Sequence, residues 1–253
     1  MIFSRVIPCL SIMDGGLVKT IQFNQPSYVG DPINAIKIFN DKEVDELVLL
    51  DITASKNRTT PNFQLIKEIA SECFMPLGYG GGITKLSEIE FLFQIGIEKV
   101  ILNSIIHTNP LLCKQAIEIF GSQSIVASID YKKPFLSKQN YPYSFSGTNK
   151  ISIPLDDYIK NIESLGFGEI ILNSIDRDGK MNGYDLTTIE KISKQVNIPV
   201  VALGGASSLN DFKLALKSGA SAVAAGSYFI YQPPHRAVLI TYPSQEELHL
   251  IQS

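Results

Sequence analysis

The stretch Ile125-Val126-Ala127-Ser128-Ile129-Asp130 consists of β-branched, small and apolar residues and ends on a carboxylate. This composition predicts a short buried strand whose last side chain is an acid. In a barrel of parallel strands and helices, catalytic side chains stand at the carboxyl ends of the strands, because these ends form the mouth. Asp130 is therefore our first candidate for general acid–base catalysis; the alternative is a cap for the following loop.

The second half of the chain repeats the first at an offset of 123 residues. Three pairs of motifs at the ends of expected strands share this offset: Glu46 and Glu169, Gly81-Gly82 and Gly204-Gly205, and Asn103-Ser104 and Gly226-Ser227. A fixed internal period identifies a repeated architecture. It predicts one domain over residues 1–253, built from two half-barrels at about 1–122 and 123–253.

Strand candidates alternate with amphipathic helices along the whole chain. The strands are expected at 5–11, 46–52, 76–79, 99–103, 125–130, 169–174, 199–203 and 221–226, with helices at 62–71, 86–94, 157–164 and 188–195 among others. Such alternation indicates a parallel sheet, either closed or doubly wound and open. The half-chain repeat favours closure, and 253 residues is about the length of one barrel. The predicted fold is α/β, a single (β/α)₈ barrel.

Composition excludes several classes of function. The net charge of −3 and the pI of about 5.7 argue against a nucleic-acid partner, which usually meets a basic face. No apolar run is long enough for a membrane span, and the N-terminal residues show no signal-peptide pattern. Cys9, Cys73 and Cys113 are predicted to be reduced core thiols of a cytoplasmic protein. Neither Cys nor His has the spacing of a metal site.

Two connections are longer than a barrel needs, and both follow strand ends at the mouth. Residues 14–32 follow the first strand, and residues 131–150 follow the fifth and are expected to form a small hairpin or cap. The tail from Gln232 is predicted to be extended before a short final helix.

Glycine turns in both halves are candidate phosphate loops. The candidates are Gly81, Gly82, Asn103 and Ser104 in the first half and Gly204, Gly205, Gly226 and Ser227 in the second. Glycine lets backbone N–H groups approach an anion, and a helix N-terminus beyond it adds favourable potential. Thr84 and either Ser207 or Ser208 are expected to cap those helices. The alternative is a purely structural tight turn; two related sites fit an elongated ligand with a phosphate at each end.

Polar residues at other strand ends have two interpretations each. Asp176 and Asp178-Gly179 follow the sixth strand and are expected to bind ligand hydroxyls or a phosphate, or to stiffen the loop. Asp51 ends the second strand and either orients a polar group in the mouth or caps its loop. Lys19 either clamps a phosphate or is a solvated loop lysine.

Four charged residues stand at or just before strand starts, at the opposite end of the barrel: Arg5, Glu46, Lys99 and Glu169. Because strand starts converge there, two cations and two anions are expected to form a ring across the axis. From the residues alone, a stabilising salt-bridge plug is the usual role at that face.

The chain resembles the cyclase subunit of imidazole glycerol phosphate synthase, the HisF family, over nearly its whole length. The resemblance rests on Arg5-Val-Ile-Pro-Cys-Leu10, Asp45-Glu-Leu-Val-Leu-Leu-Asp-Ile-Thr-Ala-Ser55, Gly80-Gly-Gly-Ile83, Gly168-Glu-Ile-Ile-Leu172, Ser174-Ile-Asp-Arg-Asp-Gly179 and Gly183-Tyr-Asp185. It implies two phosphate sites and an axial passage for ammonia from a HisH-type glutaminase at the barrel bottom. It further implies that the charged ring gates this passage and that Glu98 faces the glutaminase.

One position departs from this family. Its mechanism uses two catalytic aspartates, and the residue expected opposite Asp130 is Ser11. A hydroxyl is not ionised at neutral pH, and losing one acid–base group typically costs about two to four orders of magnitude in rate. Asp14 lies beyond the strand end, so we do not expect it to substitute. The tail Pro234–Pro243 resembles a paralogous branch linked to surface-polysaccharide pathways that make acetamidino sugars.

Three hypotheses follow. The first is a HisF-type subunit that receives ammonia and supplies it for amidination of an N-acetylated nucleotide sugar, with a sugar amidotransferase as a further partner. The second is the histidine-pathway cyclase, a lyase with Asp130 as its main acid–base group. The third is a non-catalytic scaffold that activates the glutaminase. A phosphorylated small molecule is the expected ligand, and no hypothesis requires a cofactor or a metal.

Overall fold

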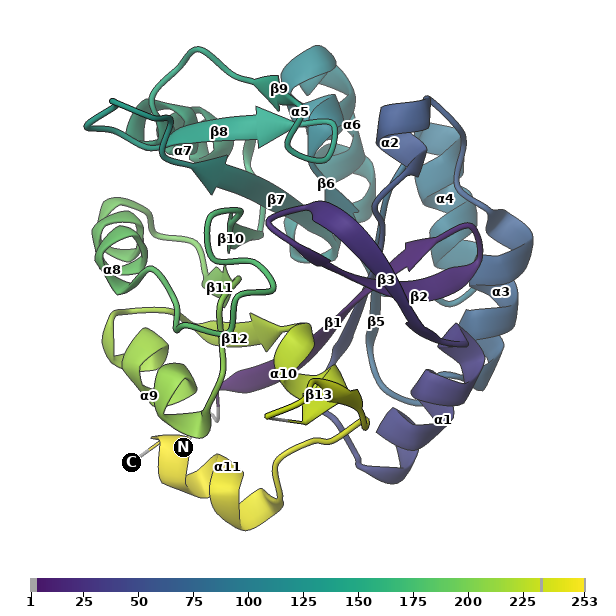
Figure 1. The fold of residues 1–253 in the computed structure, drawn as a ribbon. Coiled ribbons are helices and arrows are strands. Elements are labelled where there is room, and N and C mark those ends of the chain that lie inside the picture. The colour runs from purple at the N-terminus through teal and green to yellow at the C-terminus, as the bar shows by residue number, and fades with distance from the viewer. Residues whose placement is uncertain (1–3, 233, 253) are drawn as a thin grey trace.

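The computed structural model describes residues 4–232 and 234–252 and is a closed parallel barrel (Figure 1). The barrel strands are β1 (Arg5–Met13), β4 (Leu47–Asp51), β5 (Leu77–Gly80), β6 (Lys99–Leu102), β7 (Ile125–Lys132), β10 (Glu169–Ser174), β11 (Val200–Leu203) and β12 (Ala222–Ala225). Each pairs in parallel with the next, and β12 pairs with β1, so the ring closes. The predicted (β/α)₈ barrel is confirmed, and each strand lies within two residues of its expected bounds.

Helices surround the strands as an outer layer (Figure 1). The longer ones are α1 (Pro32–Asp41), α3 (Phe63–Glu72), α4 (Leu86–Gln94), α6 (Pro110–Phe120), α7 (Leu155–Leu165), α8 (Leu186–Gln195), α9 (Leu209–Lys217) and α11 (Gln245–Gln252). Short helices α2 (Ala54–Asn57), α5 (Ser104–Thr108) and α10 (Ser227–Ile230) follow β4, β6 and β12, and a 3₁₀ turn covers Ser122–Ser124. All four predicted helices are present, with bounds shifted by at most two residues.

Two apolar clusters fill the structure. The smaller one lies inside the barrel and includes Ile7, Val48, Val126, Ile171 and Val201, which point inward from five strands. The larger one joins the outer faces of the strands to the helices. Because strand side chains alternate between two faces, the barrel strands supply both clusters, except β5, whose Gly78 and Gly80 add no side chain to the smaller one.

Hairpins lie at the mouth after β1 and β7. Strands β2 (Gly16–Ile21) and β3 (Asn24–Gly30) form the first, which crosses in front of the barrel strands (Figure 1). Strands β8 (Tyr141–Ser144) and β9 (Asn149–Lys150) form the second, so the predicted hairpin is confirmed. In the tail, β13 (Tyr231–Gln232) pairs with β14 (Ala237–Val238) before α11, as expected, while Pro233 lies outside the described residues.

Two of the three cysteines are core residues. Cys9 and Cys113 are buried, but Cys73 is only partly buried because it follows the last turn of α3. The prediction of three core thiols is therefore wrong for Cys73. None of the helices formed by residues 4–232 and 234–252 has both the length and the apolar character needed to cross a membrane.

Phe212 tests how far stability depends on the layer between helices and strands. Its side chain on α9 is fully buried and stacks on Phe229, with ring centroids 6.0 Å apart. Phe212→Ala is expected to lower the free energy of unfolding by about 3–5 kcal/mol, because it leaves a cavity. Leu111→Ala on α6, where the side chain is 72% exposed, is the control and should change it by less than about 0.5 kcal/mol. Urea unfolding measures both; equal losses would contradict the assignment.

Candidate functional site

Asp130 lies near the end of β7, and its carboxylate is held by two amides from neighbouring strands. Asn103 donates from Nδ2 at 3.1 Å to Oδ2, and Asn173 donates from Nδ2 at 2.9 Å to Oδ1. Asp130 is 9% exposed, and this burial raises its pKa to about 7, outweighing the two amides that favour the charged form. A carboxyl group with a pKa near neutrality can both accept and donate a proton under physiological conditions.

Asn173 belongs to this site although the sequence did not single it out. It is 5% exposed, and its Oδ1 is buried without a hydrogen-bond partner among the described residues. The sequence feature that could have indicated Asn173 is its position near the end of the strand that precedes Asp176. An unpaired buried acceptor beside a carboxylate leaves room for one donor from a ligand.

Ser11 lies on the wall opposite Asp130. Its strand β1 and the strand β7 of Asp130 are four strands apart in either direction around the eight-stranded ring. Ser11 pairs with Leu50 of β4 and with Val18 of β2, and its side chain is partly exposed. Asp14 lies in the exposed turn beyond β1, at φ 51°. This position beyond the strand end agrees with the expectation that Asp14 does not substitute for a carboxylate at position 11.

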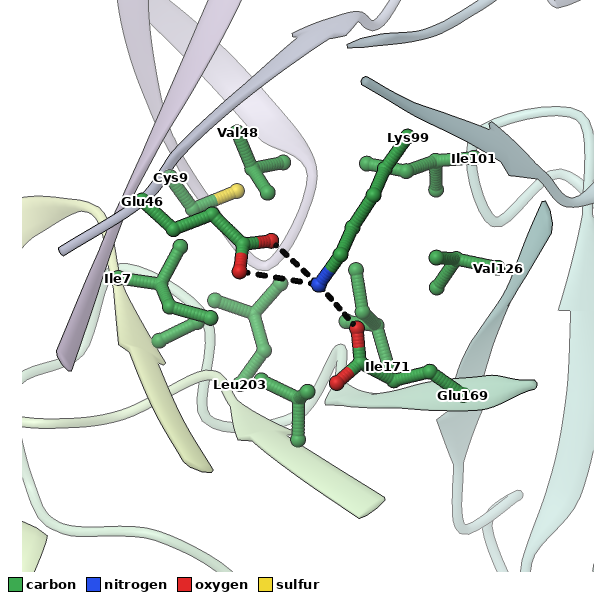
Figure 2. Close-up of a pocket in the computed structure, with 12 residues that line it drawn as sticks. Ile7, Cys9, Glu46, Val48, Lys99, Ile101, Val126, Glu169, Ile171 and Leu203 are labelled. Carbon is green, nitrogen blue, oxygen red and sulfur yellow. Dashed lines mark hydrogen bonds and ion pairs between the residues drawn. The ribbon is translucent and has the colours of Figure 1, made fainter. Parts of the chain in front are cut away.

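All four predicted ring residues meet at the other end of the barrel. Lys99 Nζ lies 2.9 Å from Glu46 Oε2 and 2.9 Å from Glu169 Oε2, between the two carboxylates (Figure 2). Arg5 pairs with the same two carboxylates through its two terminal nitrogens. Glu46 and Glu169 are nearly buried, so each depends on these two cations for compensation.

A small axial cavity lies directly above this ring. It has room for about one water molecule, about 10 Å³. Lys99, Glu46 and Glu169 form its floor, and apolar side chains and Cys9 form its walls (Figure 2). Ammonia is similar in size to water, so the space above the ring is large enough for one molecule of it.

The first set of phosphate candidates lines a cavity of about 400 Å³ at the mouth. Gly82, Asn103 and Ser104 are in its lining, together with Arg58. Gly81 is not in the lining; its backbone packs against Asp51, whose carbonyl oxygen would lie 2.6 Å from a side-chain carbon added at Gly81. The sequence reasoning did not identify Arg58.

The second set lines a much smaller space, of about 10 Å³. Its lining consists of Leu203, Ala206, Met181 and Ala225 with all six predicted residues of this half, Asp178, Gly179, Gly204, Gly205, Gly226 and Ser227. Gly179 is tightly packed: a side-chain carbon there would lie 2.0 Å from the carbonyl oxygen of Thr20 on the first hairpin. One wall of the pocket, at Gly179, thus packs against that hairpin.

Lys19 is buried beside the second pocket. Its Nζ donates to the carbonyl oxygen of Cys9 at 2.8 Å, and would lie 2.4 Å from a side-chain carbon added at Gly226. Burial lowers the pKa of Lys19 and raises that of nearby Asp178, which accepts a hydrogen bond from Thr20 Oγ1 at 3.1 Å. The alternative of a solvated loop lysine is therefore wrong.

At the helix N-termini beyond the glycine loops, a carboxylate already accepts hydrogen bonds from the backbone, which offsets part of the favourable potential expected there for a phosphate. Glu88 accepts from the backbone N–H groups of Thr84 and Lys85 at the start of α4. Asp211 accepts from those of Ser207 and Ser208 at the start of α9. The expected cap Thr84 is also wrong, since Lys85 is the N-cap residue, whereas Ser208 caps α9.

Three predicted acids make local contacts. Asp51 Oδ1 accepts from the backbone N–H groups of Thr53 and Ala54, each at 2.9 Å, as a loop cap does. Asp176 Oδ2 accepts from the N–H of Lys133 at 2.9 Å. Glu98 is exposed at the start of β6, on the side of the charged ring.

The sequence of this chain is similar to those of known proteins over nearly its whole length. A family described as "Histidine biosynthesis protein" matches residues 5–233. A Pseudomonas aeruginosa protein provisionally named imidazole glycerol phosphate synthase subunit hisF2 is 49% identical over 249 residues, 98% of this chain and 99% of the relative. One from Vibrio vulnificus, provisionally named subunit hisF3, is 46% identical over 98% of this chain and 95% of the relative. The imidazole glycerol phosphate synthase subunit HisF of Natranaerobius thermophilus is 38% identical, over 97% and 98%.

The pKa of Asp130 gives a pH dependence of stability. The folded protein keeps this proton up to a pH of about 7, while an unfolded Asp loses it near about 3.9. Wild-type stability is therefore expected to fall, relative to Asp130→Asn, as the pH rises from about 4 to about 7, by at most about 1.4 kcal/mol per unit. Urea unfolding across this range measures the difference. Parallel curves for the two proteins would contradict the raised pKa.

Proposed function

The chain belongs to the histidine biosynthesis protein family and is HisF-like, and from this premise we propose that it conducts ammonia from a glutaminase and supplies it for amidination of an N-acetylated nucleotide sugar. The glutaminase docks at the end of the barrel that carries the charged ring. Ammonia passes along the axis to the mouth, where a sugar amidotransferase takes it up. In the net reaction an acetamido group and ammonia give an acetamidino group and water: the ammonia nitrogen replaces the carbonyl oxygen. If the partner enzyme activates that oxygen with a nucleoside triphosphate, the oxygen leaves with the transferred phosphoryl or nucleotidyl group, and hydrolysis of the triphosphate accounts for the water.

The observation that carries this proposal is the combination of an intact ring with a hydroxyl on the wall opposite Asp130. Glu46 and Glu169 each contact both cations of the ring, beneath an axial cavity of the size of ammonia. At the mouth, the wall opposite Asp130 presents Ser11. A route for ammonia is thus retained, while one of the two carboxylates that cyclisation uses in the resembled family is replaced by a hydroxyl.

The hydroxyl of Ser11 supports a reaction different from the cyclisation of the resembled family. Ser11 can donate or accept a hydrogen bond, but it does not accept a proton at neutral pH. Asp130 remains able to do so, with its pKa of about 7. With one acid–base group in place of two, cyclisation is expected to be slower by about two to four orders of magnitude.

The similarity to known relatives also bears on the proposal that this chain differs from the histidine-pathway cyclase. Of four provisionally named relatives at 45–49% identity, two carry the numbered names hisF2 and hisF3 and two carry the name HisF, while the HisF subunit of Natranaerobius thermophilus is 38% identical. The chain is thus more similar to the four provisionally named subunits than to that HisF subunit, and we infer that it shares their branch of the family.

The second candidate is the cyclase of histidine biosynthesis itself. The geometry of Asp130 favours it, since two amides hold the carboxyl in place and burial adjusts its pKa to about 7. The candidate phosphate residues of both halves also line pockets at the mouth, as a substrate with a phosphate at each end requires; the first has room for a phosphate, and the second, at about 10 Å³, would have to widen to admit one. Under this candidate, Asp130 alone is the main acid–base group.

Complementation of a strain without its histidine-pathway cyclase separates the two candidates. The wild-type chain is expected not to support growth without histidine, and Ser11→Asp is expected to restore growth. The added carboxylate should raise cyclase turnover by about two to four orders of magnitude. Ser11→Asn is the matched control, because it has nearly the same size without the charge.

Growth with the wild-type chain would establish the cyclase and reject the main proposal. Growth with neither protein, although both are soluble, would show that more than position 11 separates this barrel from a cyclase, and amidination would then be assayed with the partner enzymes.

Lys99→Met tests the route of ammonia. The change removes the ammonium group that joins Glu46 to Glu169 across the axis, so ammonia is expected to leak at the bottom. With ¹⁵N-amide glutamine as the source, label in the amidinated sugar should fall severalfold, while glutamine hydrolysis continues and added ammonium restores product. Lys67→Met, an exposed change on α3, is the control and should leave labelling unchanged. Undiminished labelling in Lys99→Met would reject the axial route.

A further inference from the structure

The loop between β7 and β8, residues 133–140, presents the two most exposed large apolar side chains among residues 4–232 and 234–252. Phe135 is 94% exposed, and its neighbour Leu136 is 91% exposed. The loop follows the carboxyl end of β7, so it lies at the mouth end of the barrel, and it reaches the edge of the molecule beside α7 (Figure 1). These two residues form the apolar tip of the loop, and contiguous exposed apolar surface marks a candidate contact site.

Hydrogen bonds hold the apolar tip in a defined turn. The N–H of Ser137 donates to the carbonyl oxygen of Pro134 at 2.9 Å, which closes a tight turn around Phe135 and Leu136. Ser137 Oγ then donates to the carbonyl oxygen of Gln139 at 2.9 Å and accepts from its N–H at 3.0 Å. Leu136 has a φ of 67°, in the left-handed region that disfavours a leucine. A strained turn that exposes two apolar side chains adds nothing to the core, and such strain often occurs at functional sites.

Positive charge is concentrated around this tip. Residues 131–150 contain Lys132, Lys133, Lys138 and Lys150 and no Asp, Glu, Arg or His, so the segment carries a formal charge of +4. The whole chain carries −3, and the remaining residues therefore carry −7, because −3 minus +4 is −7. Lys133 and Lys138 are exposed, and none of the salt bridges within residues 4–232 and 234–252 includes either of them.

Tyrosine rings lie behind the tip and hold the other two lysines. Lys132 Nζ lies 4.4 Å from the centre of the Tyr143 ring, and Lys150 Nζ lies 3.7 Å from that of Tyr141. Both tyrosines belong to β8, which pairs with β7 at the base of the loop. Apolar residues at a tip, with lysines and tyrosines around them, match the layers of a bilayer surface, where amphipathic side chains lie at the headgroups.

We propose that the loop of residues 133–140 binds the surface of an anionic phospholipid bilayer. Phe135 and Leu136 insert at the boundary between headgroups and acyl chains, and the four lysines of residues 131–150 contact anionic headgroups. Apolar insertion and electrostatic attraction act together in reversible surface binding, which needs no membrane-spanning helix. This proposal goes beyond the supply of ammonia and does not rest on it.

The size of the tip favours a bilayer over a protein partner. A stable protein interface buries about 800 Å² on each partner, around a well-packed centre. Two side chains at one turn supply only on the order of a few hundred Å². A bilayer needs no matching pocket, and its diffuse negative charge suits lysines that are spread over a segment rather than aimed at one carboxylate. An acidic groove on another protein is the alternative occupant, which the test below excludes or establishes.

The first test is flotation of the full chain with vesicles of equal parts phosphatidylglycerol and phosphatidylcholine. Wild-type protein is expected to float with these vesicles at low salt and to be released as salt rises to about 0.5 M, because salt screens the lysines. Affinity for vesicles of phosphatidylcholine alone should be at least about tenfold weaker. Phe135→Ser and, separately, Lys133→Gln/Lys138→Gln should each weaken binding to the anionic vesicles by about tenfold.

Matched controls come from the opposite end of the barrel and from distant helices. Phe74 is 85% exposed and precedes the start of β5, so Phe74→Ser removes an exposed ring far from the tip. Lys67→Gln/Lys217→Gln removes two exposed lysines of α3 and α9. Each control should change vesicle affinity by less than about twofold, because these residues lie outside the contact and salt screens distant charges.

Tryptophan fluorescence tests insertion separately from attraction. The chain contains no Trp, so Phe135→Trp and Phe74→Trp each introduce a single fluorophore. With anionic vesicles, the emission of Phe135→Trp is expected to shift to shorter wavelength and to be quenched by brominated acyl chains. The emission of Phe74→Trp should stay unchanged.

Failure of the wild-type chain to float with anionic vesicles would overturn the proposal. So would equal losses in Phe135→Ser and Phe74→Ser, or an unshifted emission of Phe135→Trp. If Phe135→Ser instead weakened association with the glutaminase or the sugar amidotransferase, and no vesicle binding occurred, the tip would be a protein contact and not a membrane contact. The complementation and labelling experiments use no vesicles, so their failure leaves this result standing.

Discussion

The pairing of four charges across the barrel axis is the interaction on which the rest of this structure depends. Glu46 and Glu169 are nearly buried, and each contacts both Arg5 and Lys99. Removing one partner of a buried ion pair commonly costs about 3–5 kcal/mol, whereas replacing the whole group by apolar side chains is often neutral or stabilising. Stability alone therefore gives little reason to keep four charges here, and a route that admits a small polar molecule gives a better one.

The two halves of the chain are alike in backbone and different in chemistry. Carboxylates at positions 88 and 211, 123 residues apart, close the helix starts in the same way, and left-handed residues at 58 and 181 face their pockets in the same way. Side chains then break the symmetry: Ser11 faces Asp130, and Arg58 corresponds to Met181. Because turns and caps set the backbone, these substitutions alter charge at the mouth without altering the barrel.

Much of this arrangement could be predicted from the sequence, because it depends on local patterns. Buried strands such as 125–130 and the meeting of the ring residues follow from composition and from the convergence of strand starts. The capping role of Asp211 also follows from a local pattern, as an acid three residues after Ser208, whereas that of Glu88 does not, because its N-cap residue is Lys85. Burial of Lys19 was not, because it depends on the docking of the first hairpin over a distant strand end. Asn173 and Arg58 were missed for the same reason, since pocket neighbours are set by the whole fold.

The hairpins at the mouth bear both on the pKa of Asp130 and on the retention of ammonia under the proposed function. The first hairpin docks on the loop after β10, where the N–H of Gln22 donates to the carbonyl oxygen of Asp178 and its Nε2 donates to that of Asp176. The second hairpin donates from Ser146 Oγ to the carbonyl oxygen of Ile52. The second hairpin also pairs with the strand of Asp130, and burial of this carboxyl raises its pKa to about 7. Under the proposed function, the hairpins at the mouth therefore have two effects. They hinder the escape of ammonia into solvent, and they contribute to the burial that keeps the pKa of Asp130 near 7, where this group can exchange a proton with the arriving ammonia.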